Sequence, residues 1–227
     1  MSATRFSYVE FCLVIASAFG WAIIGSVYAL AADKTVGQVG VPDAFTDKYL
    51  LGVVLQELLL APVAASILYV RGWRIADFHV HPSILATVLG LGIALIAFVA
   101  DWLITFVVQL AFPAIHSALQ IVDAFKPTHG PGLPTIVLVS LINPVFEEVF
   151  VCGYVIEALR ERFGLTTAIN VSVLIRASYH LYQGIGTLPF HCAYGLLQAY
   201  AYVRFRRLWP LIVSHAVLDF AAFVQMI

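Results

Sequence analysis

The chain of 227 residues is 62% hydrophobic and only 11% charged, with a formal net charge of −1 at pH 7. Soluble domains carry roughly 25% charged and 45–50% apolar residues, so this composition predicts an integral membrane protein. The charge excludes the basic footprint of a nucleic-acid-binding protein. Because apolar segments run from end to end, we expect one membrane-embedded domain over residues 1–227, with no separate soluble domain.

Apolar stretches long enough to cross a membrane recur along the whole chain. A spanning helix needs about 20 predominantly apolar residues. Lipid offers the backbone no hydrogen-bond partners, so an open sheet is excluded and the stretches are expected to be helices. The prediction is an all-α, polytopic transmembrane bundle of about seven spans. These are 8–32, 48–70, 83–112, 134–159, 166–183, 188–204 and 208–226.

The basic residues between the predicted spans indicate the orientation, because cytoplasmic loops carry an excess of Lys and Arg. If seven helices alternate, eight basic residues fall on one side and three on the other. This asymmetry predicts a cytoplasmic N-terminus. The eight are Arg5, Arg71, Arg74, Arg160, Arg162, Arg204, Arg206 and Arg207, and the three are Lys34, Lys48 and Lys126. The remaining one, Arg176, lies inside a predicted span.

Polar pairs four residues apart occur in the span 134–159. This span contains the adjacent carboxylates Glu147 and Glu148. Asn143 precedes Glu147 by four residues, and Cys152 follows Glu148 by four, so each pair shares a helix face. Ionised groups are costly in hydrocarbon and are a functional-site hypothesis by default.

Two later spans carry similar pairs. Arg176 and His180 are four residues apart, as are His215 and Asp219. Three helices can therefore direct polar pairs toward one interior. A carboxylate and an imidazole can hold a water and take its proton, and a second imidazole can donate to a developing oxyanion. The same residues can instead bind a metal that activates water, or relay protons.

Three segments carrying these pairs resemble the motifs of a known family. They are EEVFVCGY, RASYHLYQG and HAVLD, at 147–154, 176–184 and 215–219. They are similar to the E-E-x-x-x-R, F-x-x-x-H and H-x-x-x-N/D motifs of the CAAX protease and bacteriocin-processing (CPBP, or Abi) family of intramembrane glutamic endopeptidases, which includes type II CAAX prenyl endopeptidases. The resemblance covers roughly residues 134–226.

The resemblance implies an intramembrane endopeptidase and assigns roles by position. Glu147 would activate water with the assistance of His180, and His215 and Asp219 would line the oxyanion site. Glu148 would be the supporting carboxylate. The family's present description implies no cofactor and no metal, although Glu and His side chains can also bind zinc. It also implies a prokaryotic plasma-membrane protein that acts on a membrane-associated protein or peptide.

The sequence departs from the family pattern at two positions. Cys152 stands where the first motif has arginine, and Arg176 stands where the second has phenylalanine. Two adjacent buried carboxylates repel each other, and a fixed arginine cation offsets that repulsion. We therefore predict that the Arg176 guanidinium lies within ion-pair reach of Glu148, with Cys152 beside it. The alternative is that Arg176 pairs with Asp101.

Other interpretations of the sequence stay open. A catalytically degenerate scaffold that binds a partner helix is one of them. A proton-coupled transporter is another, although the chain lacks the internal repeat that many transporters carry. His191 is interpreted as interfacial or structural, and Glu57 as a hydrogen-bonding residue of the bundle or a support for the site. The substrate and the oligomeric state are not predicted.

Overall fold

The computed structural model describes residues 6–32, 45–111 and 130–227, and this part of the chain contains helices and no strand. The α-helices are α1 (Tyr8–Ala31), α2 (Asp47–Val70), α3 (Ile84–Ala111), α6 (Leu133–Glu147), α7 (Val155–Phe163), α8 (Leu165–Tyr179), α9 (Leu188–Phe205) and α10 (Trp209–Val224). A π-helical segment, η2 (Glu148–Tyr154), joins α6 to α7. The short 3-10 segments are η1 (Ile75–Phe78), η3 (Leu181–Gln183) and η4 (Ile185–Thr187).

Each of the seven predicted spans contains a helix, which confirms the all-α bundle. Four helical rods are long and apolar enough to cross a membrane: α1, α2, α3 and the continuous rod Leu133–Phe163. The predicted span 166–183 is shorter in the structure, because α8 ends at Tyr179 and Gly184 adopts a positive φ of 92°. The 15 residues of α8 rise about 22 Å, which is less than the roughly 30 Å of a hydrocarbon core.

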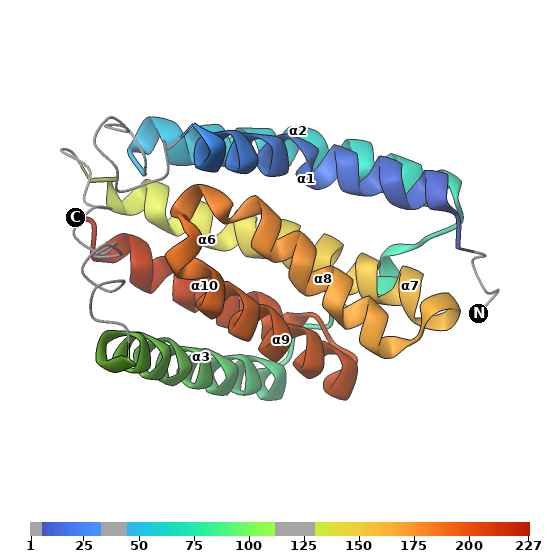
Figure 1. Ribbon diagram of the computed structural model, residues 1–227. Coiled ribbons are helices and arrows are strands. Elements are labelled where there is room, and N and C mark those ends of the chain that lie inside the picture. The colour runs from blue at the N-terminus through green and yellow to red at the C-terminus, as the bar shows by residue number, and fades with distance from the viewer. Residues whose placement is uncertain (1–5, 33–44, 112–129) are drawn as a thin grey trace.

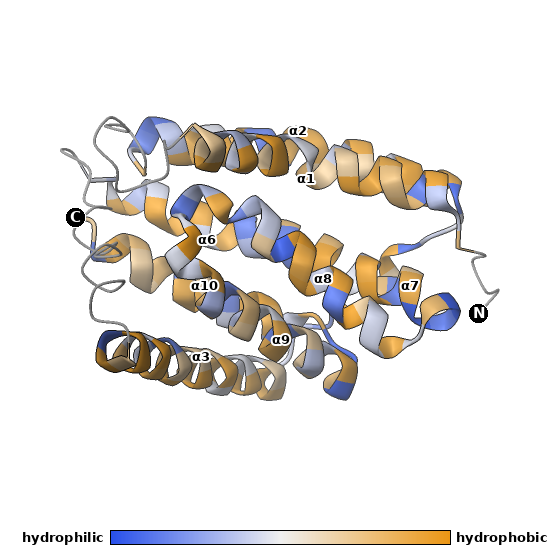
Figure 2. Ribbon diagram, in the orientation of Figure 1, coloured by the Kyte–Doolittle hydropathy of each residue, from blue (hydrophilic) through white to orange (hydrophobic). Residues whose placement is uncertain are grey.

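The helices lie nearly parallel or antiparallel to one another in several layers (Figure 1). The pair α1 and α2 lies along one side, α6 and α8 occupy the middle, and α3 lies at the opposite edge beyond α9 and α10. The outer helix α3 is hydrophobic along most of its length, whereas hydrophilic residues interrupt α8 (Figure 2). The motif-bearing helices therefore form the interior of the bundle.

Close packing fixes α10 against α3. A Cβ atom added at Gly90 of α3 would lie 2.7 Å from the Pro210 carbonyl oxygen and 2.7 Å from the Val213 Cβ atom. Only glycine permits this approach, because real Cβ atoms do not come so near other heavy atoms. The contact holds the first turns of α10, and therefore the axial position of His215 further along that helix, against the bundle.

The two ends of the bundle differ in charge. Successive helices alternate in direction, so the connections α2–α3, α7–α8 and α9–α10 lie at the same end (Figure 1). This end, called the arginine end below, carries Arg71, Arg74, Arg160, Arg162, Arg204, Arg206 and Arg207. Lys48, at the start of α2, lies at the opposite end. The predicted positions of Arg5, Lys34 and Lys126 lie outside the described residues.

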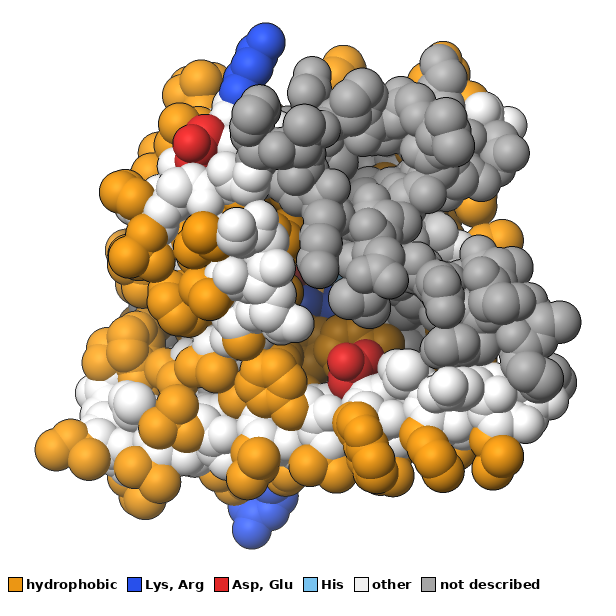
Figure 3. All heavy atoms as spheres, turned by 90° about the vertical axis from the view of Figure 1, so that its left-hand side faces the viewer, with side chains coloured by type: hydrophobic (Ala, Val, Ile, Leu, Met, Phe, Trp, Pro, Cys, Tyr) orange, Lys and Arg blue, Asp and Glu red, His pale blue; other side chains and the backbone are white. Residues whose placement is uncertain are grey.

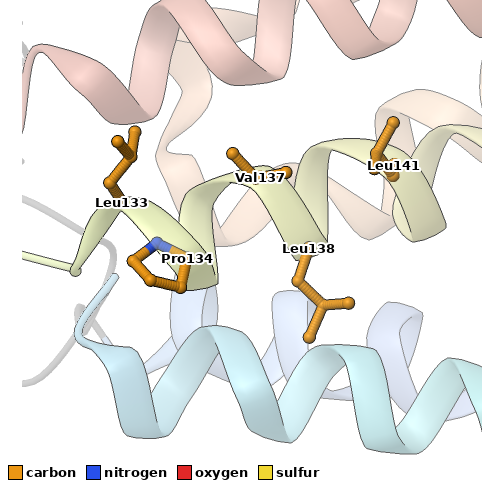
Figure 4. Close-up of a pocket in the computed structure, with 5 residues that line it drawn as sticks. All are labelled: Leu133, Pro134, Val137, Leu138 and Leu141. Carbon is orange, nitrogen blue, oxygen red and sulfur yellow. The ribbon is translucent and has the colours of Figure 1, made fainter.

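An apolar pocket of about 460 Å³ lies on the outer face of α6 (Figure 4). It is lined by Leu133, Pro134, Val137, Leu138 and Leu141. These side chains offer no charge, so the pocket suits contact with lipid or another apolar group. None of the predicted site residues lines it.

Candidate active site

The two adjacent glutamates lie where the helix changes its winding. Glu147 ends α6, and Glu148 begins the π-helical segment η2. Pro144, within α6, has no N–H to donate to the preceding turn. The Ser172 hydroxyl of α8 donates to the Val151 carbonyl oxygen at 2.8 Å. Single turns of π-helix occur frequently at functional sites, and this one carries Glu148 and Cys152.

Arg176 joins α8 to both glutamates. Its Nη2 atom lies 2.7 Å from Glu148 Oε1, and its Nη1 atom lies 3.4 Å from Glu147 Oε2. The same Nη2 is 3.9 Å from Cys152 Sγ. The Arg176 side chain is 1% exposed and that of Glu148 is fully buried. The prediction that the Arg176 guanidinium lies within ion-pair reach of Glu148, with Cys152 beside it, is thus confirmed. The alternative pairing with Asp101 is wrong, because that residue lies exposed on α3.

His215 of α10 lies between carboxylates. Its Nδ1 atom is 2.7 Å from Glu148 Oε1, and its Nε2 atom is 3.5 Å from Asp219 Oδ1. The ring meets the edge of Tyr194 at a centroid distance of 5.7 Å, and Arg176 lies over the same tyrosine ring at 5.3 Å. Glu148, rather than Asp219, is therefore the nearer partner of the histidine. Asp219 is itself held by Asn143, whose amide donates to Asp219 Oδ2 at 2.9 Å.

Four site residues surround one oxygen atom, Glu147 Oε2. The Tyr179 hydroxyl donates to Glu147 Oε2 at 2.5 Å. The same oxygen lies 3.4 Å from Arg176, 3.9 Å from His180 Nε2 and 4.0 Å from His215 Nε2. The structure thus brings the predicted residues Glu147, His180 and His215 together.

Two residues that sequence reasoning did not place in the site belong to it. Tyr179 contacts Glu147, and its spacing of three residues from Arg176 places both on one helix face. His191, interpreted from the sequence as interfacial or structural, stacks on His180 with ring centroids 4.1 Å apart and an interplanar angle of 5°. His191 Nε2 lies 2.7 Å from Gln183 Oε1. The sequence signal that could have placed His191 in the site is its position in a mostly apolar helix.

Glu57 of α2 lies next to the site. It is 7% exposed and lies close enough to Glu147, Asp219 and His215 for electrostatic interaction with them. Several buried polar atoms here have no hydrogen-bond partner among the described residues: Glu57 Oε2, Glu148 Oε2, Arg176 Nε and His180 Nδ1. Among the residues that the structure describes, no three His, Cys, Asp or Glu side chains are grouped so that they could hold a metal ion.

Residues 129–221 match the model of the family described as type II CAAX prenyl endopeptidase Rce1-like. The match spans all three motif segments and confirms the resemblance predicted from them. This part of the chain is therefore similar to the Rce1-like CAAX proteases, and the four membrane-spanning helical rods make the protein an integral membrane protein. No curated protein and no solved structure matches the chain.

Proposed function

We propose that this protein is an intramembrane glutamic endopeptidase, which hydrolyses a peptide bond of a membrane-associated protein or peptide. The observation that carries the proposal is the convergence of Tyr179, Arg176 and two histidines on Glu147 Oε2. A carboxylate placed beside two imidazoles is an arrangement that can hold a water and remove its proton.

In the proposed mechanism, Glu147 accepts a proton from water, while His180 holds the same water on its other side. The resulting hydroxide attacks the carbonyl carbon of the substrate and forms a tetrahedral intermediate. The proton on Glu147 then passes to the nitrogen of the leaving amine as the C–N bond breaks. Tyr179 and Arg176 fix the carboxylate, which gives the reaction a preorganised base.

His215 supplies the oxyanion contact in this mechanism. The contact of its Nδ1 atom with Glu148 fixes the orientation of the imidazole ring and leaves the Nε2 atom for the substrate. An imidazolium donates through both ring nitrogens, and the proposal uses the Nε2–H for the oxygen that becomes negative. Such a donor is worth roughly 10²–10³ in turnover. Asp219 and Asn143 support this side of the site.

The proposal includes no metal or other cofactor. Two measurements test this part. Elemental analysis of purified protein should find no stoichiometric zinc, and strong chelators should leave the activity unchanged. About one zinc per chain, with activity restored only by zinc, would overturn this part. The proposal also places the protein in a prokaryotic plasma membrane, as the resemblance implies. It places the N-terminus in the cytoplasm, because the arginine end carries most of the basic residues of the described connections.

The decisive experiment compares peptides released from membranes that contain the wild-type protein or Glu147→Gln. Peptides present with the wild type and missing with the variant identify the substrate and the cleaved bond. Glu161→Gln makes the same chemical change at an exposed residue outside the site and is the matched control. Identical peptide profiles for all three proteins would remove Glu147 from the chemistry and favour the scaffold or transporter interpretation.

A further inference from the structure

Helix α1 lies outside the segment that the family model matches, yet it adjoins the candidate active site. The match begins at residue 129, far beyond the end of α1. Hydrophobic side chains project all around the described outer surface seen in Figure 3, as expected for a bundle in lipid. Phe19 and Ser26 of α1 face inward instead, and each is 2% exposed. Both contact Tyr179, whose hydroxyl donates to Glu147 Oε2 at 2.5 Å.

The Phe19 ring contacts both helices that form the tyrosine–glutamate hydrogen bond. It stacks on the Tyr179 ring of α8, with centroids 4.9 Å apart and an interplanar angle of 8°. It also meets the edge of Phe146, which directly precedes Glu147 on α6, at a centroid distance of 5.7 Å. Stacked and edge-to-face arrangements are the favoured geometries of aromatic pairs. One ring of α1 therefore fixes the end of α8 relative to the end of α6.

Ser26 fixes the backbone at the same end of α8. Its hydroxyl donates to the Tyr179 carbonyl oxygen at 2.7 Å, and the last carbonyls of an α-helix have no partner within the helix. The peptide bond between Tyr179 and His180 is planar, so a fixed carbonyl also fixes the direction in which His180 leaves α8. The His180 Nε2 atom lies 3.9 Å from Glu147 Oε2. One serine thus orients two neighbours of the proposed base.

The hydrogen bond between Tyr179 and Glu147 depends on this packing. Its length of 2.5 Å lies at the short end of the range for a hydroxyl that donates to a carboxylate. Hydrogen bonds weaken steeply as the donor angle departs from linear, and small displacements of reacting groups are costly in turnover. Loss of the Phe19 ring leaves space into which the Tyr179 ring can turn away from the carboxylate.

We propose that α1 completes the active site, and that Phe19 and Ser26 are its positioning residues. They hold Tyr179 and His180 in place, and these two fix the carboxylate of Glu147 and the water beside it. Neither α1 residue contributes a group to the chemical steps. The inference rests on the proposed function for its effect on turnover, whereas the effect on the surroundings of Tyr179 is measurable without turnover.

Phe19→Leu tests the ring contact, and Phe11→Leu is its matched control on the same helix. Phe11 stacks on Tyr154 at a centroid distance of 6.0 Å, and that tyrosine donates to Glu10 instead of Glu147. Peptide release per folded molecule should fall roughly tenfold or more for Phe19→Leu, because a hydrogen bond to a charged group is weakened. It should stay at the wild-type level for Phe11→Leu. A purely structural role of Phe19 would lower the folded fraction and leave this ratio unchanged.

Ser26→Ala tests the backbone contact. Its control, Ser17→Ala, removes an exposed hydroxyl of α1 that donates to the Leu13 carbonyl oxygen at 2.7 Å. Ser26→Ala should lower peptide release per folded molecule by roughly twofold to tenfold, as expected for a neutral hydrogen bond, and Ser17→Ala should not. Ser26→Thr keeps the hydroxyl and should retain most of the release. Wild-type release from both Phe19→Leu and Ser26→Ala would overturn the proposal.

A second measurement does not require activity. Protein labelled with meta-fluorotyrosine gives a fluorine resonance for each tyrosine, and the resonance missing from Tyr179→Phe belongs to Tyr179. This resonance should shift in Glu147→Gln, Phe19→Leu and Ser26→Ala and stay in place in the two control variants. An unchanged resonance in Phe19→Leu and Ser26→Ala would overturn the positioning role even if the protein is a peptidase. If the resonance shifts as expected but no peptide depends on Glu147, the proposed function is the part that fails.

Discussion

Two buried carboxylate clusters lie in this bundle and use similar residue types. In the first, the Glu10 cluster, Arg71 Nε donates to Glu10 Oε2 at 2.9 Å. Trp73 Nε1 and the Tyr154 hydroxyl donate to Glu10 Oε1 at 3.0 and 3.2 Å. The second, the Glu147 cluster, consists of the two adjacent glutamates with Arg176, Tyr179 and the histidines. Each cluster combines a buried carboxylate, an arginine and a tyrosine.

The clusters differ in how far their hydrogen bonds are completed. Both Glu10 oxygens accept hydrogen bonds, from Arg71 and Trp73 of the α2–α3 connection and from Tyr154 of η2. This carboxylate therefore fixes α1 against these two segments. In the Glu147 cluster, three buried polar atoms have no partner within residues 6–32, 45–111 and 130–227: Glu148 Oε2, Arg176 Nε and His180 Nδ1. Unsatisfied buried groups are rare and costly in native proteins. The comparison indicates that the first cluster holds structure, and we propose that the second keeps these atoms for the water and substrate of the proposed reaction.

The largest expected effect is that of Glu147→Gln on turnover. Gln keeps the shape of the side chain but cannot accept a proton, so peptide release should fall by roughly 10²–10⁴-fold. The unfolding temperature in detergent should change little. A variant that is stable and fully active would place the base elsewhere and end the distinction between the two clusters.

Arg176→Ala should damage both stability and activity. It leaves Glu148 buried without its cation, and breaking a buried ion pair from one side costs about 3–5 kcal/mol of unfolding free energy. Denaturant titration in detergent measures this loss. The double variant Arg176→Phe with Cys152→Arg rebuilds the family motif and should recover part of the activity. If the double variant is no better than Arg176→Ala, the cation is not interchangeable between the two helices.

Glu10→Gln should lower stability without changing the chemistry. The loss of charge weakens the bonds from Arg71 and Trp73, and hydrogen bonds to charged groups contribute about 1.5–3 kcal/mol. Turnover per folded molecule should equal that of the wild type. Comparison of unfolding with turnover in one preparation separates the two effects, and a loss of turnover at full stability would show that the Glu10 cluster acts on the site.

The smallest effect is expected for His191→Phe. Phenylalanine can keep the stack on His180 but loses the contact with Gln183, which positions the pair. A neutral hydrogen bond contributes about 0.5–1.5 kcal/mol, so turnover should fall by roughly twofold to tenfold. His191→Ala, which removes the stack as well, should be slower than His191→Phe. Equal activity of both variants and the wild type would restrict His191 to a structural role.

The sequence by itself determined the membrane class, the helical segments and the polar pairs. Lipid requires helices, and the helical period then places residues four apart on one face, as with Arg176 and His180. These regularities depend only on the local chain and the solvent. The missing family arginine and the intramembrane Arg176 were also visible together, which is why the ion pair of Arg176 with Glu148 was predictable.

Tertiary structure decided which groups meet across helices. Asp219 is four residues from His215, yet the nearer partner of the ring is Glu148 on another helix. The end of α8 at Tyr179, where Ser26 of α1 donates to the Tyr179 carbonyl at 2.7 Å, was likewise not readable from hydropathy. Distances between helices depend on their rotation and axial offset. Packing contacts such as that of Gly90 with Val213 set these quantities, and no local pattern in the sequence encodes them.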